Sequence, residues 1–161
     1  MNDKGQPDFS FSEQTILDEI ERNLHAHGWA THVTVVRLLQ GWQSLSLSLD
    51  LYTGTIDDYT NDLTGRDALA IVLAECPEPL HSKLKNLVDN FDGEFAARTQ
   101  DDTECLLIRY FRIEETAGWW WKRRPAAGPL AEYLTFTGTR AEYLALRRQK
   151  IAPGSGYSKP S

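Results

Sequence analysis

The fold is decided by one stretch in the middle of the chain, residues 57–69, which reads Asp57-Asp58-Tyr59-Thr60-Asn61-Asp62-Leu63-Thr64-Gly65-Arg66-Asp67-Ala68-Leu69. Just before it, Thr55 and Asp58 have the spacing of a capping box, in which the threonine oxygen and the acid satisfy free N–H groups of a first helical turn. Apolar residues then recur at helical spacing and so share one face: Ile56, Tyr59, Leu63, Ala70 and Leu73. The pattern predicts an amphipathic helix from about residue 56 to residue 76.

Arg66 falls on that apolar face, where a charged side chain has to be explained. A lone buried guanidinium costs too much free energy, so we expect it to be paired. Asp62, one turn earlier, is the predicted partner in a structural ion pair, with Asp58 and Asp50 as alternatives. A different interpretation makes Asp58, Asp62 and Arg66 the carboxylate–arginine centre of an enzyme.

Composition indicates an ordinary globular protein. The chain has 161 residues, enough for one domain with a real core, and 41% of them are hydrophobic and 25% charged. The net charge of −6 disfavours nucleic-acid binding by the whole surface and suits a basic partner. Cys76 and Cys105 form no CxxC motif, and we recognise neither a signal peptide nor a membrane span. We therefore expect a soluble, cytoplasmic protein with free thiols.

The N-terminal half is predicted to be helical. A capping box at Ser10 opens a first helix that ends at Gly28. Residues 31–52 fit helical spacing over five turns but also alternate like a strand near their end. We choose the helix because its pattern runs longer and includes Trp42. Prolines after residue 76 end the next helix, and a fourth follows with its core positions at Leu80, Leu84, Leu87, Phe91 and Phe95.

The composition of the sequence changes after a predicted polar loop at residues 100–102, where short apolar and aromatic runs replace the helical pattern. Two short apolar and aromatic runs, 105–111 and 119–121, have a five-residue turn at residues 114–118 between them and predict a β-hairpin. A continued helix through residues 103–113 is the competing interpretation.

Two further helices are predicted near the C-terminus, one from Pro129 through Phe136 and one over residues 139–150. Residues 12–151 then form a single helical domain. A loose arm, residues 1–11, precedes it, and a disordered tail rich in glycine, serine and proline, residues 152–161, follows it.

The run Trp119-Trp120-Trp121-Lys122-Arg123-Arg124 has the most unusual composition in the chain. Three adjacent indoles cannot all face one way, so we expect at least one near the surface. Exposed tryptophan beside arginine is typical of protein-interface hot spots and of sites that stack bases and contact phosphates. The alternative is structural, with two rings filling the core while the cations reach outward.

Metal and cofactor sites receive little support. His25, His27 and His32 lack the i, i+4 spacing of helical ligands. The acids of the third helix, with Glu94, could bridge a metal between helices, but the chain has no Glu-x-x-His motif of the kind such sites use. Phosphate-binding glycine loops and hydrolase motifs are also missing. We expect neither a metal nor a cofactor.

The chain resembles a group of small uncharacterised bacterial helical proteins over roughly residues 29–99. The residues that carry this resemblance are Trp42, Leu49-Asp50-Leu51-Tyr52, Asp58-Tyr59, Asn61-Asp62-Leu63, Arg66-Asp67, Leu69, Phe91-Asp92 and Phe95. More distantly, its helical class, size and acidity are similar to those of colicin-type immunity proteins, which block bacterial toxins. Neither resemblance transfers a functional residue.

The sequence thus predicts a mainly α fold, an antiparallel helical bundle with a short aromatic hairpin and C-terminal helices packed outside. The favoured function is a non-catalytic protein-binding module, such as an immunity-type inhibitor of a basic toxin or nuclease. The alternatives are a nucleic-acid-binding module acting through residues 119–124 and the enzyme described above. The predicted partner-binding residues are Trp119, Trp120, Trp121, Arg123, Arg124, Asp57, Asp58, Asn61 and Asp67.

Overall fold

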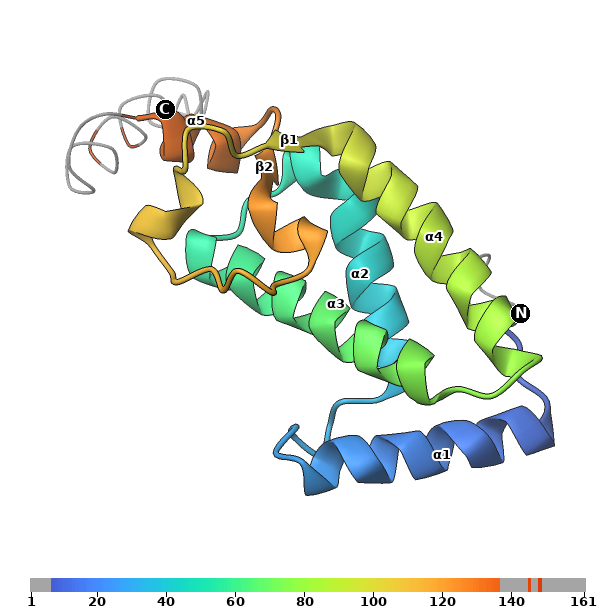
Figure 1. The fold of residues 1–161 in the computed structure, drawn as a ribbon. Coiled ribbons are helices and arrows are strands. Elements are labelled where there is room, and N and C mark those ends of the chain that lie inside the picture. The colour runs from blue at the N-terminus through green and yellow to red at the C-terminus, as the bar shows by residue number, and fades with distance from the viewer. Residues whose placement is uncertain (1–6, 137–144, 146–147, 149–161) are drawn as a thin grey trace, which may run out of the picture.

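The protein is a mainly α, antiparallel helical bundle. The computed structural model describes residues 7–136 together with Ala145 and Arg148. Within them α3 runs antiparallel to α4, α2 packs against both, and α1 lies across the end of the bundle beside α3 (Figure 1). The helices are α1 (Phe11–Ala26), α2 (Val35–Ser48), α3 (Ile56–Glu75), α4 (Leu80–Arg98) and α5 (Pro129–Thr135).

The predicted capping boxes open α1 and α3. The Ser10 hydroxyl accepts from the backbone N–H of Glu13 at 3.2 Å, and the Glu13 carboxylate accepts from that of Ser10 at 2.9 Å. Thr55 and Asp58 make the same two contacts at the start of α3. Each pair satisfies N–H groups that the first turn leaves free, so both starts follow from the local sequence. Gly28, with φ +100°, follows the C-terminal end of α1 as predicted.

The ambiguous segment 31–52 is helical over most of its length, as predicted, from Val35 to Leu51. Thr34 caps α2, and a 3₁₀ turn over Leu49–Leu51 continues the chain in the same sense. The face of this segment that carries Val35, Leu39 and Trp42 is buried in the core. Burial of that apolar face stabilises the helix, and this stabilisation outweighs the local preference of the valines for a strand.

The core lies between α1, α2, α3 and α4. Fully buried side chains include Trp42, Tyr59, Leu63, Leu84 and Phe95. Among the described residues no helix has the length and apolarity needed to cross a bilayer.

The predicted hairpin over residues 105–121 is wrong, and so is the competing helix through 103–113. The strands are instead β1 (Thr99–Asp101) and β2 (Arg123–Pro125), which pair antiparallel, so that part of the predicted polar loop is strand. The apolar runs form 3₁₀ turns at Leu107–Arg109 and Trp119–Lys122. The Asp102 carboxylate explains the first turn, because it accepts the N–H groups of Leu106 and Leu107, each at 2.9 Å.

We call residues 102–122 the strap. This segment leaves the small sheet after β1, passes over α3 and returns to the sheet at β2 (Figure 1). A connection of this length without regular strands or α-helices is uncommon in a compact domain and usually has a function.

After the strap, α5 begins at Pro129 as predicted. Of the predicted helix over residues 139–150, the structure describes only Ala145 and Arg148, which are both helical, and the predicted tail from residue 152 lies outside the described residues. The predicted arm, residues 1–11, is described only from Pro7, and its last residue, Phe11, already belongs to α1.

Candidate functional site

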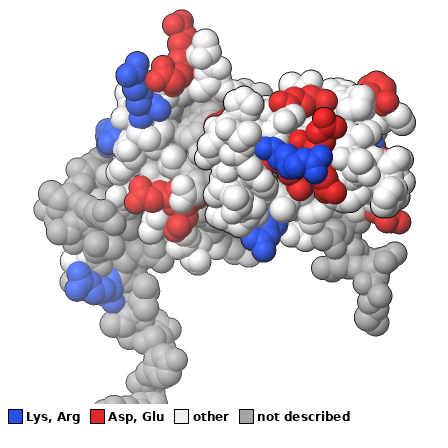
Figure 2. Space-filling model, turned by 90° about the horizontal axis from the view of Figure 1, so that it is seen from below, with Lys and Arg blue, Asp and Glu red and all other residues white. Residues whose placement is uncertain are grey.

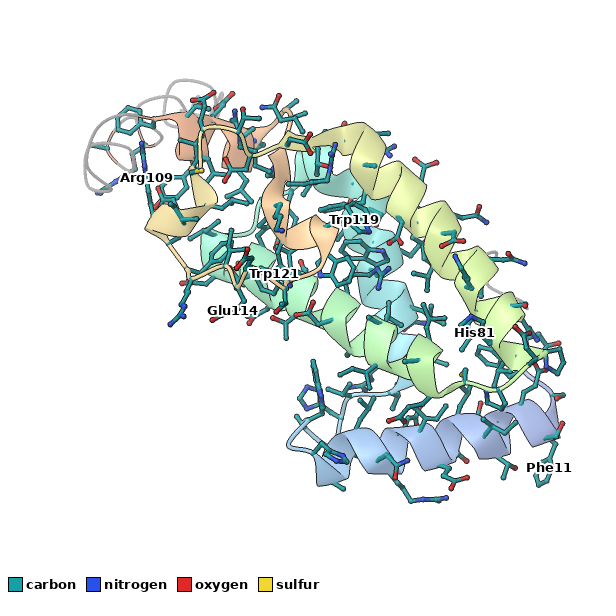
Figure 3. The ribbon with its side chains drawn as sticks, in the orientation of Figure 1. Phe11, His81, Arg109, Glu114, Trp119 and Trp121 are labelled. Carbon is teal, nitrogen blue, oxygen red and sulfur yellow. The ribbon has the colours of Figure 1, made fainter. Side chains whose placement is uncertain are left out.

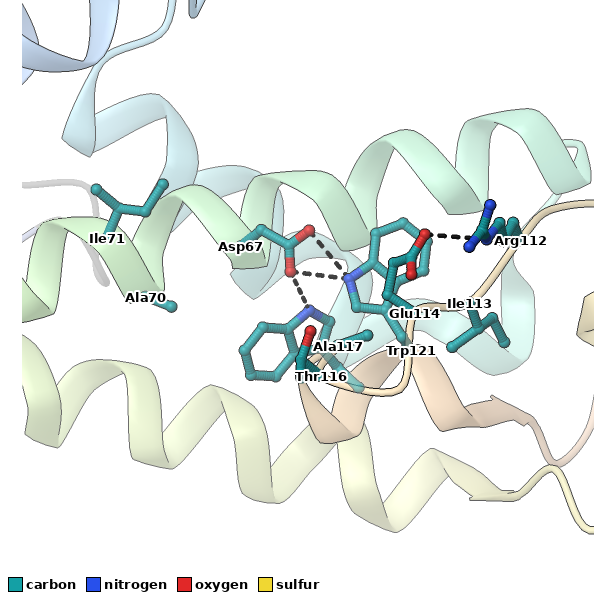
Figure 4. A pocket seen from close by; sticks show the side chains of 11 residues that line it. Asp67, Ala70, Ile71, Arg112, Ile113, Glu114, Thr116, Ala117 and Trp121 are labelled. Atoms are coloured by element: carbon teal, nitrogen blue, oxygen red, sulfur yellow. Dashed lines mark hydrogen bonds and ion pairs between the residues drawn. The ribbon is translucent and has the colours of Figure 1, made fainter. Parts of the chain in front are cut away.

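The strap is fastened to α3 by one carboxylate. Asp67 accepts a hydrogen bond from the indole N–H of Trp120 at 2.8 Å, and the indole N–H of Trp121 lies 2.8 and 3.0 Å from its two oxygens (Figure 4). At the base of the strap, the Tyr59 hydroxyl donates to the carbonyl oxygen of Arg123 at 2.7 Å. One face of α3 therefore holds the strap at its base and at the indole pair.

Arg66 points inward, as predicted, but Asp62 is the wrong partner. The Arg66 Nε and Nη2 atoms donate to the two oxygens of Asp92 on α4, both at 2.9 Å. The indole N–H of Trp42 donates to the same carboxylate at 2.9 Å, and the guanidinium carbon lies 4.1 Å from the Trp120 ring centroid. Arg66 thus ties α3 to α4 and supports the strap from beneath by a cation–π contact.

The partner of Asp62 is Tyr52 and not Arg66. The Asp62 carboxylate accepts the Tyr52 hydroxyl at 3.0 Å. Burial raises the pKa of Asp62, and the Tyr52 hydrogen bond partly offsets that effect by lowering it. Burial, followed by the nearby charge of Asp62, raises the pKa of Tyr52.

The predicted carboxylate–arginine centre is not assembled. Asp58 caps α3 through Thr55, Asp62 accepts from Tyr52, and Arg66 pairs with Asp92. The three residues have separate partners, so nothing brings the two acids to the guanidinium.

The three tryptophans differ in exposure, as predicted for adjacent rings. Trp120 is buried, Trp121 is half-buried, and Trp119 is 41% exposed. The Trp119 ring lies 5.9 Å from Phe95 on α4 and edge-on to Trp120 at 6.0 Å, measured between centroids. Figure 3 shows Trp119 towards α4 and Trp121 over α3. Trp119 is therefore accessible but held on two sides.

The two arginines after the tryptophans are engaged within the protein. Arg123 donates to the Thr99 hydroxyl at 2.7 Å, to the Ala96 carbonyl at 3.1 Å and to the Asp101 carboxylate at 2.7 Å. Arg124 is buried and pairs with Asp102 and Glu104 at 3.4 and 3.1 Å. Both cations hold the small sheet and the start of the strap together.

The predicted partner-binding residues of α3, three aspartates and Asn61, separate into two groups. Asp57, Asp58 and Asn61 are exposed on the N-terminal half of α3, whereas Asp67 is half-buried against the strap. On the face seen in Figure 2, acidic side chains form several separate groups with single basic side chains among them. The described residues of that face present no broad basic area of the kind that binds a phosphate backbone.

A groove of about 530 Å³ lies between α3 and the strap (Figure 4). Helix α3 contributes Asp67, Ala70 and Ile71, and the strap contributes Arg112, Glu114 and Trp121 among others. Of these lining residues, Ile71, Arg112 and Glu114 were not predicted as site residues from the sequence. Ile71 follows Asp67 by one helical turn and could have been found from that spacing, whereas nothing in the sequence marks the two charged residues.

His25 and His27, two of the three histidines considered as metal ligands, make local backbone contacts. A ring nitrogen of His25 lies 2.8 Å from the Val33 carbonyl oxygen, and one of His27 lies 2.7 Å from that of Asn23. In the part of the chain that the structure describes, no three side chains of histidine, cysteine, aspartate or glutamate are grouped to hold a metal ion.

The chain matches no protein-family model, no curated protein and no solved structure.

Proposed function

We propose that this protein is a non-catalytic protein-binding module that engages a basic partner through the strap and the adjoining face of α3. One observation carries the proposal: Trp119 is 41% exposed although Phe95 and Trp120 hold its ring. A rigid, exposed indole loses little conformational entropy on binding and buries a large apolar area, which is the property of interface hot spots.

Charge supports a basic partner. The protein carries a net charge of −6, and Asp57 and Asp58 are exposed on α3. Complementary charge would steer a cationic protein towards this surface and raise its association rate. An immunity-type inhibitor that holds a basic toxin or nuclease in the cytoplasm is the specific form of the proposal that agrees with the acidity, the size and the helical fold.

The two alternatives have less support. A nucleic-acid-binding site in the Trp119–Arg124 run needs free cations for phosphates, and both Arg123 and Arg124 have internal carboxylate partners. The enzyme alternative needs Asp58, Asp62 and Arg66 together, and each has a different partner.

The test compares two exposed aromatic side chains. Trp119→Ala removes the proposed hot spot, and Phe11→Ala is the control, because Phe11 is 90% exposed on α1, away from the strap (Figure 3). The full-length variants are used for affinity capture from the native host, and the captured protein is then titrated by calorimetry. We expect a basic partner whose binding weakens by about 2 kcal/mol or more with Trp119→Ala and is unchanged with Phe11→Ala.

Melting temperatures distinguish binding from folding. Trp119→Ala should melt close to the wild type, because it removes a partly exposed ring. Trp120→Ala should melt much lower, because Trp120 is buried, covers Arg66 and donates to Asp67. Equal partner binding by Trp119→Ala and Phe11→Ala would contradict the proposal, and so would tight, salt-dependent binding of single-stranded RNA or DNA by the wild type.

A further inference from the structure

The groove between α3 and the strap has an unusual balance of hydrogen-bonding groups. The indole N–H groups of Trp120 and Trp121 are both directed to Asp67, so neither is free to donate into the groove. The walls offer instead the apolar side chains of Ala70 and Ile71, the body of Trp121 and the carboxylates of Asp67 and Glu114, with one cation, Arg112, which pairs with Glu114. Such a site suits a ligand group that donates hydrogen bonds, carries positive charge and has an apolar stem.

We propose that this groove receives an arginine side chain of the partner protein, an inference that rests on the proposed function. A guanidinium is planar, stacks on indole rings and donates two parallel hydrogen bonds to a carboxylate. The propyl stem of arginine would pack against Ile71 and Trp121, and its head would reach the carboxylates of Glu114 and Asp67.

The protein already contains this combination of groups in its own interior. The Arg66 guanidinium lies 4.1 Å from the Trp120 ring centroid and donates two hydrogen bonds of 2.9 Å to Asp92. Trp120 and Trp121 are adjacent, so the proposed site would place a second guanidinium beside the next indole. We propose arginine and not lysine as the ligand, because only the guanidinium is planar and can donate two parallel hydrogen bonds.

Glu114 can change its partner at little cost. It now pairs with Arg112 at 3.0 Å, and the two side chains are 64% and 86% exposed. Exposed pairs of this kind contribute about 0–1 kcal/mol. The Arg112–Glu114 pair shows that Glu114 accommodates a guanidinium. An arginine of the partner, which would also stack on Trp121, would therefore displace Arg112 at little cost. The volume of about 530 Å³ exceeds what one arginine side chain needs, so backbone of the partner can enter as well.

The test uses a small probe, N-acetylarginine methylamide, with the full-length protein. Indole N–H signals are followed by NMR during titration, with the equivalent lysine, norleucine and glutamate derivatives for comparison. We expect arginine to shift the Trp121 indole signal with a dissociation constant of about 1–10 mM, as such a small ligand allows. Glu114→Gln should weaken that binding about threefold or more, because the charge-assisted bonds are lost. Glu115→Gln, an exposed neighbour outside the groove, should leave it unchanged.

The possible outcomes are distinct. Absence of a saturable Trp121 shift overturns the inference, as does binding that Glu114→Gln and Glu115→Gln affect equally. Lysine binding as tight as arginine overturns the choice of arginine. Trp119 does not line the groove, so Trp119→Ala should bind the arginine probe normally. If the probe binds but Trp119→Ala keeps full affinity for the partner, the proposed function fails while the arginine site stands.

Discussion

Replacing Arg66 by methionine tests how the buried charge network holds the bundle together. The substitution keeps a flexible apolar stem but leaves the Asp92 carboxylate, whose side chain is 15% exposed, with the Trp42 indole as its remaining hydrogen-bond donor among the contacts described. Removing one partner of a buried pair costs about 3–5 kcal/mol. The partial exposure of Asp92 places the expected loss near the lower end, about 3 kcal/mol of unfolding free energy. For a domain of this size that loss lowers the Tm by about 6–12 °C.

The assay is urea unfolding followed by far-UV circular dichroism, because tryptophan fluorescence would respond directly to the changed site. A double-mutant cycle with Asp92→Asn isolates the pair, since asparagine keeps a carbonyl acceptor for Trp42. The double variant should be more stable than the sum of the two single losses predicts, by about 1.5–3 kcal/mol.

Lys85 and Asp89 provide the matched control, because they form an ion pair of 2.7 Å on α4 with both side chains about half exposed. Lys85→Met should cost no more than about 0.5 kcal/mol. A loss below about 1 kcal/mol for Arg66→Met, or additive single losses in the cycle, would show that Arg66 does not pair α3 with α4 as described.

Three further predictions concern other parts of the fold. Burial first, and the charge of Glu75 second, raises the pKa of the Cys76 thiol to about 11, so at pH 8 a thiol reagent should label exposed Cys105 at least about tenfold faster, as measured by mass spectrometry. Gly128→Ala should destabilise by about 1–3 kcal/mol in thermal unfolding, because Gly128 has φ +96° and a Cβ there would collide with the Asp50 carbonyl. The folded-state pKa of Asp62 is raised, so its ionisation opposes folding as pH rises through that pKa. Asp62→Asn should therefore gain stability relative to the wild type at pH 7, and the gain should shrink as pH falls towards the ordinary aspartate pKa of 3.8.

The features that the sequence predicted correctly depend on local chemistry. Helix starts were found at Ser10 and Thr55 because a capping box is completed within four residues. Arg66 was placed inward because helical periodicity fixes the face of a residue whatever its partners are. The exposure of one tryptophan followed from the divergence of adjacent side chains.

The errors depend on contacts between residues far apart in the chain. Asp62 was chosen for Arg66 because it is one turn away, whereas Asp92 lies on another helix, where only the packing of α3 against α4 brings it close. The hairpin was predicted because a short apolar run has the same composition in a strand as in a turn. The Asp102 carboxylate, which accepts two backbone N–H groups after it, was a local signal that favoured the turn. The groove was not predictable, because its two walls meet only after the strap is fastened to Asp67.

The strap is joined to the rest of the protein at a three-residue strand pair, at Asp67 and through Leu106, Leu107 and Trp120, which are buried in the core, whereas residues 114–116 are exposed. The sequence of this exposed part can therefore change while α1 to α4 keep their packing, since surface connections tolerate such changes at small entropic cost. A gene encoding this fold could acquire a new binding preference through substitutions confined to residues 114–117, with the helices serving as an unchanging frame. The same separation makes residues 114–117 a natural position for grafting recognition loops of choice.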